Sequence, residues 1–281
     1  MQVEWRIPNA ETPLSQGDIL ICRDPKKGIV EAISLIITAD CDISKNKFGT
    51  HLACLRIVSF HEYLRTVWAN RKLARAVEKE TENIRVQLNK WNSRRIGDAM
   101  PLSSDTVMNW VRRSESDTIC RDLGMSDTDA AKLKLKINLF RSALESLDDK
   151  RAFDSFTQLV AFHSTLSNKN RDDCLQEALQ QAKGDELPDD IFLLPSLPQL
   201  DVGSAVVLLR EIVGIPAKVV CFRTLDAISK EFYLRIGRLE PTFKYAVSQA
   251  FGSLFSRIGL PEAYEARRET AIEQITTYNW D

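Results

Sequence analysis

Two stretches near the N-terminus decide the fold: residues 16–22, QGDILIC, and residues 33–40, ISLIITAD. Each holds a short run rich in isoleucine and bounded by Gly, Pro or Asp, which is the pattern of a β-strand between turns. In residues 33–38 the apolar side chains are consecutive rather than alternating, so this strand is expected to be buried on both faces. With a turn at 45–49, the sequence predicts three strands, near 18–22, 33–38 and 52–58.

From residue 60 to residue 190 the apolar side chains take the spacing of helices. The first helix is indicated by residues at three- and four-residue steps, among them Leu64, Val67, Trp68, Ile84, Leu88 and Trp91. Gly97 and Pro101 are expected to end it, and Ser104 is expected to cap a shorter helix. Further helices are expected around 133–144 and 153–162, before the breaker at 183–188.

The last third of the chain returns to strands, expected at 191–194, 205–209 and 217–222 and followed by a helix over 243–255. Neither strand block is large enough to be stable alone, so the simplest assembly pairs both in one sheet. The sequence therefore predicts an α+β fold. Its β-barrel domain, residues 1–59 and 191–281 with the C-terminal helix, is split by a helical insertion, residues 60–190.

Several short motifs follow one another in a distinctive order in the two strand blocks. They are residues 16–20 (QGDIL), 34–40 (SLIITAD), 52–55 (LACL), 193–195 (LLP), 204–209 (SAVVLL), 225–226 (LD), 235–239 (RIGRL) and 258–260 (IGL). In this order they resemble the PemK/MazF toxins, over roughly residues 45–60 and 190–260. The resemblance implies an SH3-like barrel. In that family the barrel is a ribonuclease that cleaves single-stranded RNA.

The sequence departs from that family at both catalytic positions. The family's catalytic Arg lies just before the second strand, where this chain has Glu31, Ala32 and Ile33. Its catalytic Thr closes the third strand, where this chain has Arg56, Ile57 and Val58. A ribonuclease of this type needs a base for the 2′-hydroxyl and a cation for the phosphorane, and neither is in place.

Asp40 and Asp42 form the most distinctive short acidic motif, Asp40-Cys41-Asp42. If the strand geometry persists, the two carboxylates lie on the same side. They are then candidates for a Mg²⁺ or Ca²⁺ site or for an acid–base pair. The alternative is a turn of the Asx type that ends the strand, with the side chains bonded to backbone N–H groups. We favour the turn.

Cysteine and histidine residues near the second turn provide a weaker candidate for a zinc or nucleophile site: Cys41, His51, Cys54 and His61. Structural zinc is usually held by ligand pairs two to four residues apart. Here only His51 and Cys54 are that close, and on a strand their odd separation points them to opposite faces. We therefore expect neither a metal nor a cofactor.

Residues 118–131 have the shape of a helix-turn-helix around Gly124. In such motifs the start of the second helix approaches base edges and phosphates. Here that helix would begin Asp127-Thr128-Asp129, and two carboxylates would be repelled by DNA. The motif therefore favours a structural role in packing the insertion over the reading of DNA.

The first insertion helix is the clearest charged feature. Residues 60–96 hold nine Lys and Arg against four Glu, whereas residues 97–190 hold twelve basic and eighteen acidic residues. Arg65, Lys72 and Lys79 recur every seven residues, and Arg75 lies between them. These four residues are candidates for a phosphate-binding stripe. The alternative is a solvated face that pairs with the acidic remainder of the insertion.

Composition limits the class of protein. The net charge of the 281 residues is −1, which excludes a uniformly basic nucleic-acid binder. The N-terminus lacks the pattern of a signal peptide, no apolar run reaches the length of a membrane span, and the six cysteines are scattered. We expect a soluble cytoplasmic protein with reduced thiols and no contact with a membrane.

Three functions remain open. The leading hypothesis is a non-catalytic binding or adaptor module on a degenerate barrel, whose insertion docks a protein partner in a bacterial defence or toxin–antitoxin setting. The second is an RNA endonuclease with relocated groups, in which Arg23, Lys26, Lys27 and Arg56 hold phosphate and Asp40 or Asp42 acts as base. A DNA-binding regulator ranks third, and a homodimer is left open.

Overall fold

The computed structural model describes residues 3–23, 29–97, 100–148, 155–198, 200, 203–223, 232–256, 267, 268 and 270. The chain divides into two compact units. One, called the sheet unit below, comprises Met1–Val58 and Leu187–Asp281, and the other, called the helical unit, comprises Ser59–Glu186. Each unit is described by itself.

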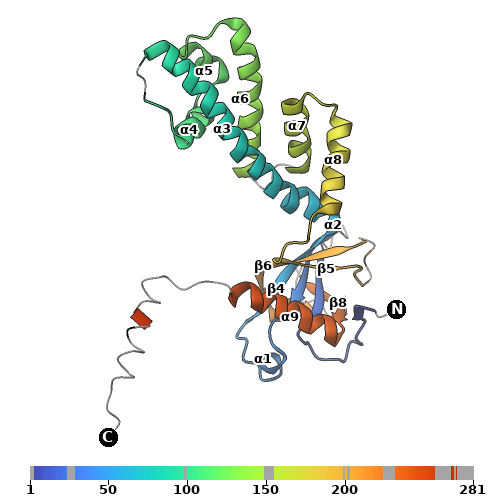
Figure 1. Cartoon of the computed structure of the whole chain (residues 1–281). Coiled ribbons are helices and arrows are strands. Elements are labelled where there is room, and N and C mark those ends of the chain that lie inside the picture. Colours follow the sequence, from blue (N-terminus) through green and yellow to red (C-terminus); the bar gives the residue numbers. More distant parts are fainter. Residues whose placement is uncertain are drawn as a thin grey trace. The chain divides into compact units, whose positions relative to one another are not determined.

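The sheet unit is built on a curled, mainly antiparallel sheet that forms a half barrel (Figure 1). Its strands in the described part of the chain are β1 Trp5–Arg6, β2 Asp18–Arg23, β3 Val30–Ile36, β4 His51–Ser59, β5 Ile191–Leu194, β6 Ala205–Pro216, β7 Val220–Cys221 and β8 Tyr233–Leu239. Their order is β1-β8-β2-β3-β4-β6-β5, and β7 pairs with β8 in parallel. The prediction that both strand blocks share one sheet is confirmed, because β8 lies beside β2 and β6 beside β4.

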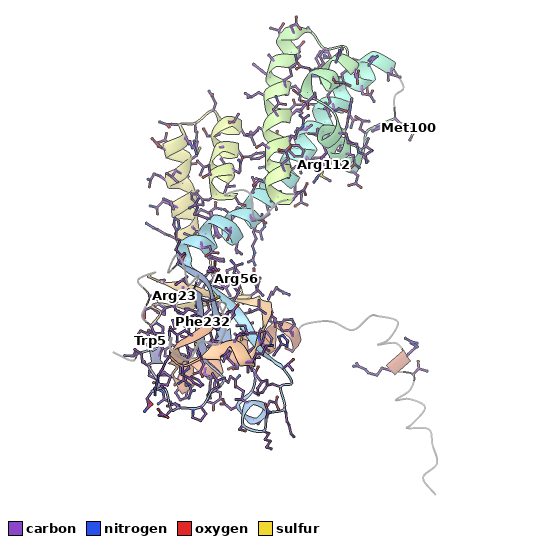
Figure 2. All side chains as sticks on the ribbon, turned by 180° about the vertical axis from the view of Figure 1, so that it is seen from behind. Trp5, Arg23, Arg56, Met100, Arg112 and Phe232 are labelled. Carbon is purple, nitrogen blue, oxygen red and sulfur yellow. The ribbon has the colours of Figure 1, made fainter. Side chains whose placement is uncertain are left out.

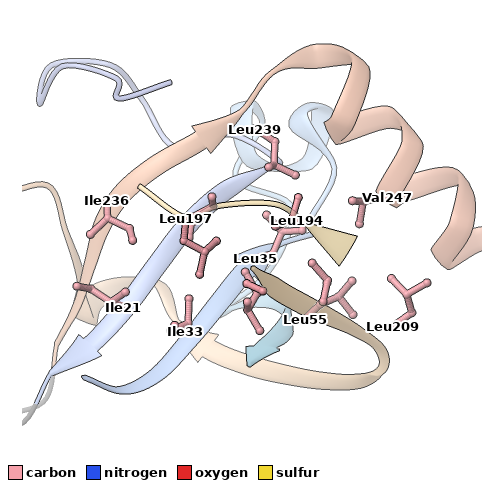
Figure 3. Close-up of a cluster of buried hydrophobic side chains, with 14 of the residues drawn as sticks. Ile21, Ile33, Leu35, Leu55, Leu194, Leu197, Leu209, Ile236, Leu239 and Val247 are labelled. Carbon is pink, nitrogen blue, oxygen red and sulfur yellow. The ribbon is translucent and has the colours of Figure 1, made fainter. Parts of the chain in front are cut away.

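Both faces of the central strands are buried, as the consecutive apolar residues predicted. One face carries Ile33, Leu35 and Leu55, which pack with residues of β2, β6 and β8 (Figure 3). Helix α9, Pro241–Ser256, covers this cluster with Val247 and Leu254. The opposite face carries a second cluster of Leu20, Ile36, Leu52, Cys54 and Ile215.

Gly237 allows β8 to approach the turn that follows β5. A Cβ atom at this position would lie 2.4 Å from Cγ of Pro198, which is closer than any real contact. Only glycine fits there without movement of the proline. The glycine of the RIGRL motif therefore has a steric role in closing the sheet unit.

Two predicted strand boundaries in the sheet unit are wrong. Strand β6 continues past residue 209 to Pro216, although Arg210 and Glu211 interrupt its apolar run and residues 210–214 are exposed. Residues 217–222, predicted as a strand, form a turn of 3-10 helix at Ala217–Val219 and the two-residue strand β7. Pro216 has no N–H to donate, which favours a change of direction at this point.

The helical unit consists of α2 Phe60–Glu62, a π-helical segment Tyr63–Trp68, α3 Ala69–Ile96, α4 Ser104–Arg113, α5 Ser116–Asp122, α6 Asp127–Asp148, α7 Ser155–Ser167 and α8 Arg171–Gly184. Helix α3 packs against α4, α6 and α7. The predicted first helix is present, but its first turns include the π-helical segment. The helix ends at Gly97, whose φ is 69°. Glycine adopts such a positive φ more readily than other residues do. The cap of α4 is Ser103, not the predicted Ser104.

Candidate functional site

Two of the motifs described above, QGDIL at residues 16–20 and RIGRL at residues 235–239, meet in a buried network of charged side chains. Asp18, at the start of β2, is fully buried. Arg238 of β8 donates to both of its carboxylate oxygens, at 2.5 and 3.0 Å, and the backbone N–H of Ser15 donates to one of them at 3.0 Å. Arg235 lies 3.6 Å from the same carboxylate. Because its oxygens are occupied in this way, Asp18 serves to hold β2 against β8.

Arg235 also fixes the N-terminal loop. Its guanidinium donates to the backbone carbonyls of Asn9 at 2.8 Å and Thr12 at 2.7 Å, and lies 4.4 Å from the ring centre of Phe222. Burial lowers the pKa of Arg235, although the neighbouring Asp18 acts in the opposite direction. From the sequence, Asp18 and Arg235 were recognised only as members of two motifs. The contact between them was not predicted, because the two residues are far apart in the chain.

Asp40, the first candidate catalytic residue, joins three segments of the sheet unit. Its carboxylate accepts hydrogen bonds from Oγ of Ser15 at 2.5 Å, from the backbone N–H of Gln16 at 2.8 Å and from Nζ of Lys244 in α9 at 2.7 Å. Partial burial acts to raise the pKa of Asp40, but these hydrogen bonds and the charge of Lys244 outweigh it, so the pKa lies below its usual value. The carboxylate is therefore held in its charged form.

The expected geometry of the Asp40–Asp42 pair is wrong. Strand β3 ends at Ile36, and residues Asp40–Ser44 form the short helix α1. Residues two apart on a helix point in different directions, about 200° around the axis, so the two carboxylates do not share a side. The favoured turn interpretation is confirmed in part, because the Asp40 side chain accepts from a backbone N–H, that of Gln16. The segment itself is a short helix without a side-chain cap and not an Asx turn. Within the residues that the structure describes, no group of His, Cys, Asp and Glu suits a metal ion.

Two of the candidate phosphate-binding residues of the sheet unit, Arg23 and Arg56, lie on different strands; both are labelled in Figure 2. Arg23 ends β2 opposite Val30, whereas Arg56 of β4 lies opposite Ser34. The two positions on β3 are four residues apart, about 13 Å along the strand. Arg56 donates to Glu211 of β6 at 3.1 Å. Lys26 and Lys27 lie outside the described residues.

The basic residues of the first insertion helix are partly engaged within the helical unit. Lys72 forms an ion pair with Asp185 at 2.8 Å, and Nε1 of Trp68 donates to the same carboxylate at 2.9 Å. These two hydrogen bonds lower the pKa of Asp185. Arg75 and Lys79 are exposed on α3, and Arg65 is exposed on the π-helical segment. One member of the predicted stripe is thus engaged with an acidic residue of the insertion, as the alternative interpretation proposed.

Cys54 and His51 lie on opposite faces of β4, as their odd separation predicted. His51 is exposed, and Cys54 is fully buried. Burial raises the pKa of the Cys54 thiol to about 12, so the thiol is protonated at neutral pH. A protonated and inaccessible thiol is not a nucleophile.

Helices α5 and α6 with the turn between them have the helix-turn-helix shape that the sequence indicated. The first turn of α6 carries Asp127 and Asp129, and Ser126 donates to the Asp129 carboxylate at 2.7 Å. Lys134 of α6 pairs with Asp117 of α5 at 2.5 Å. The surface where a recognition helix would meet phosphates is acidic, and helix α6 packs against α5.

Comparisons with protein families, with curated proteins and with solved structures find no match for this chain. In the described part of the chain, no helix has both the length and the apolar character needed to cross a membrane.

Proposed function

We propose that the protein is a non-catalytic binding module, in which the sheet unit is a degenerate PemK/MazF-like barrel and the helical unit docks a protein partner. The observation that carries the proposal is the environment of Asp40. Three donors occupy this carboxylate, and one of them is the ammonium group of Lys244. A general base must be able to reach a substrate proton, and a carboxylate held by an ion pair at lowered pKa is a weak base.

The relation to the barrel family is supported by two features. The sheet is curled and antiparallel, as an SH3-like barrel requires. The QGDIL and RIGRL motifs contact each other through Asp18 and Arg238, so the residues of the resemblance lie at a structural junction. The family's catalytic positions hold other residues here, Glu31–Ile33 and Arg56–Val58. We therefore propose that this chain retains the barrel fold of the family but not its RNA cleavage.

The docking surface that we propose is the solvent-facing side of α3. Arg75, Lys79, Val86 and Lys90 follow one another at steps of four, seven and four residues, which places them on one face. Val86 is 57% exposed, and the three cations have no ion-pair partner among the residues that the structure describes. Glu82 lies on the same face but is paired with Arg85, so the unpaired charges around Val86 are cationic. Such a face suits a protein partner with an acidic surface. A bacterial defence or toxin–antitoxin system is the setting that we propose.

RNA cleavage separates this proposal from the endonuclease alternative. Purified protein is incubated with a labelled single-stranded RNA, with and without Mg²⁺, beside the variant Asp40→Ala. We expect no cleavage above the level of a buffer control in any sample. Cleavage that is retained through purification and lost in Asp40→Ala would instead establish the endonuclease.

The docking surface is tested by co-purification with the products of adjacent genes. The triple variant Arg75→Glu, Lys79→Glu, Lys90→Glu is compared with wild type and with a control, Lys132→Glu, which changes an exposed lysine of α6 in the same unit. We expect a partner to be retained by wild type and control and lost by the triple variant. Equal retention by all three proteins would exclude this face of α3 as the docking surface.

A further inference from the structure

The sheet unit contains a pocket that none of the hypotheses above uses. Its volume is about 490 Å³. Its described lining consists of Thr50 and His51 at the start of β4, Pro216 at the end of β6, and Ala217 and Lys218 in the 3-10 turn that follows. The backbone N–H of Ala217 donates to the carbonyl of Thr50 at 3.1 Å, which ties the two sides together. Pockets of about 300 to 1,000 Å³ commonly hold small ligands.

Two of the lining residues, Pro216 and Ala217, are apolar and partly buried. Ala217 packs against the buried cluster that includes Leu52, Cys54 and Ile215. Pro216 has a rigid ring and no N–H group. A flat apolar group placed on Pro216 and Ala217 would therefore rest on a preformed surface, with little conformational entropy to lose.

The polar groups at the rim are cationic or hydrogen-bond donors. Nδ1 of His51 and Oγ1 of Thr50 are 2.9 Å apart, so this hydrogen bond orients the imidazole and leaves Nε2 for another partner. When the threonine hydroxyl donates, or when the imidazole is protonated, Nε2 carries a proton and is a donor. Lys218 is exposed and has no ion-pair partner within the described ranges. The lining residues named above include no carboxylate.

We infer that this pocket binds a small molecule with an anionic group on a flat apolar body, of the size and chemistry of a mononucleotide. Lys218 and Nε2 of His51 bind the phosphate, since charge-assisted hydrogen bonds are the strong ones. The ring of Pro216 and the side chain of Ala217 receive the base. The assignment is independent of the proposed docking function, because the pocket lies wholly in the sheet unit.

The test is a nuclear magnetic resonance titration of the whole protein with adenosine 5′-monophosphate. The chain contains three histidines, so its imidazole signals are few, and His51 is assigned by the signal lost in His51→Gln. We expect a saturable shift of the His51 signal with adenosine 5′-monophosphate. Adenosine lacks the anion and inorganic phosphate lacks the base. Each is expected to bind at least about tenfold more weakly than the nucleotide.

Three lysine variants complete the test. Lys218→Ala is expected to weaken binding by about tenfold, because one charged donor is lost. Lys218→Arg is expected to retain most of the affinity. Lys45→Ala, at an exposed lysine of the same unit outside the pocket lining, is expected to have no effect.

Several results would overturn the assignment. One is the absence of a saturable shift of the His51 signal. Another is an affinity for adenosine or for inorganic phosphate that equals the affinity for the nucleotide. A third is a loss of nucleotide affinity that is equal in Lys45→Ala and Lys218→Ala. A single-stranded RNA that shifts His51 where adenosine 5′-monophosphate does not would assign the pocket to a polymer and would also overturn it.

Discussion

Ser15 connects the two acidic residues that hold the sheet unit together. Its backbone N–H donates to Asp18, and its hydroxyl donates to Asp40. Asp18 is bound by arginines of β8, and Asp40 is bound by Lys244 of α9. The loop that contains Ser15 is thus fixed to two C-terminal elements at once.

Asp18→Ala is expected to destabilise the sheet unit by about 3 to 5 kcal/mol, because it leaves the buried Arg235 and the partly buried Arg238 without their counter-charge. Urea unfolding, followed by tryptophan fluorescence and by far-ultraviolet circular dichroism, measures the change. The control is Glu11→Ala, which removes an ion pair with Arg223 at the surface. We expect the control to change stability by less than about 0.5 kcal/mol, and a similarly small effect of Asp18→Ala would contradict the structural role of this network.

Asp40→Asn tests the hydrogen bonds of the second carboxylate through their dependence on pH. The folded-state pKa of Asp40 is lowered, so its stabilising contribution is present above the unfolded-state pKa and is lost as the pH falls through the folded-state pKa. The difference in unfolding free energy between wild type and Asp40→Asn is therefore expected to be present near pH 7 and to shrink below about pH 4.

Asp42→Asn serves as the control for this pH series, since Asp42 lies in the same helix and has none of the three donors. Its difference from wild type is expected to stay nearly constant with pH. A difference for Asp40→Asn that does not change between pH 3 and pH 7 would show that the carboxylate charge contributes nothing.

At the scale of single residues, the sequence predicted where polar groups gather but not what they contact. Asp40 was singled out by its place after an apolar run. Its partner Lys244 lies in the helix that the sequence predicted over 243–255, but the sequence did not indicate which residues that helix contacts. The motif residues Asp18 and Arg238 were recognised by order along the chain, and the contact between them follows from the pairing of β2 with β8, which no local pattern reveals.

At the scale of elements, the strands and the long helices were predicted where burial imposes a regular spacing. The short helix α1 and the π-helical geometry of Tyr63–Trp68 were not predicted, because so few residues show no distinct apolar spacing. Helix α5 was predicted as the first helix of the helix-turn-helix. Strand β6 was predicted too short because Arg210 and Glu211 interrupt its run of apolar residues. The strand nevertheless continues through Ile212 and Val213 to the buried Ile215.

Lys72→Glu distinguishes the two interpretations of the basic stripe at the level of one helix. The substitution places a carboxylate beside Asp185, which Lys72 now pairs with at 2.8 Å. We expect a loss of about 1 kcal/mol in the stability of the helical unit, measured by thermal unfolding. Lys79→Glu, at an exposed position of the same helix, is expected to have less than half of this effect.

Nucleic-acid binding is measured on the same variants by gel shift at low salt. We expect no binding by the wild type, since the net charge of −1 provides no long-range attraction for a polyanion. Binding that weakens in both variants, with an affinity that falls linearly on a log–log scale with salt, would instead establish the phosphate-binding stripe.

At the scale of the whole molecule, the two compact units differ in how their contacts are distributed along the chain. The helical unit is one continuous segment, Ser59–Glu186, with its own buried residues such as Ile84, Ile137 and Phe140. The sheet unit combines two segments, and its strands β2 and β4 are paired with β8 and β6 from the second. The sequence indicated this arrangement because neither strand block is sufficient alone.

A fragment of residues 59–186 is expected to fold independently, with helical circular dichroism and a cooperative thermal transition. A fragment of residues 1–58 is expected to remain unfolded, because β2 loses its neighbour β8 and β4 loses its neighbour β6. Amide chemical-shift dispersion provides an independent check of both. A folded 1–58 fragment, or a 59–186 fragment without a cooperative transition, would show that stability is divided differently.

The order of the strands also determines what happens while the chain is being synthesised. Strands β2, β3 and β4 leave the ribosome first, and β6 and β8 follow only after the whole helical unit has been translated. At about 5 to 20 residues per second, this interval is on the order of ten seconds. During it the outer edges of β2 and β4 have no partner, and unpaired edges of this kind invite aggregation. Helical domains usually fold in microseconds to milliseconds, so we expect the helical unit to fold within that interval. The nascent chain would then pass through a state in which the helical unit is folded and the sheet unit is not yet complete.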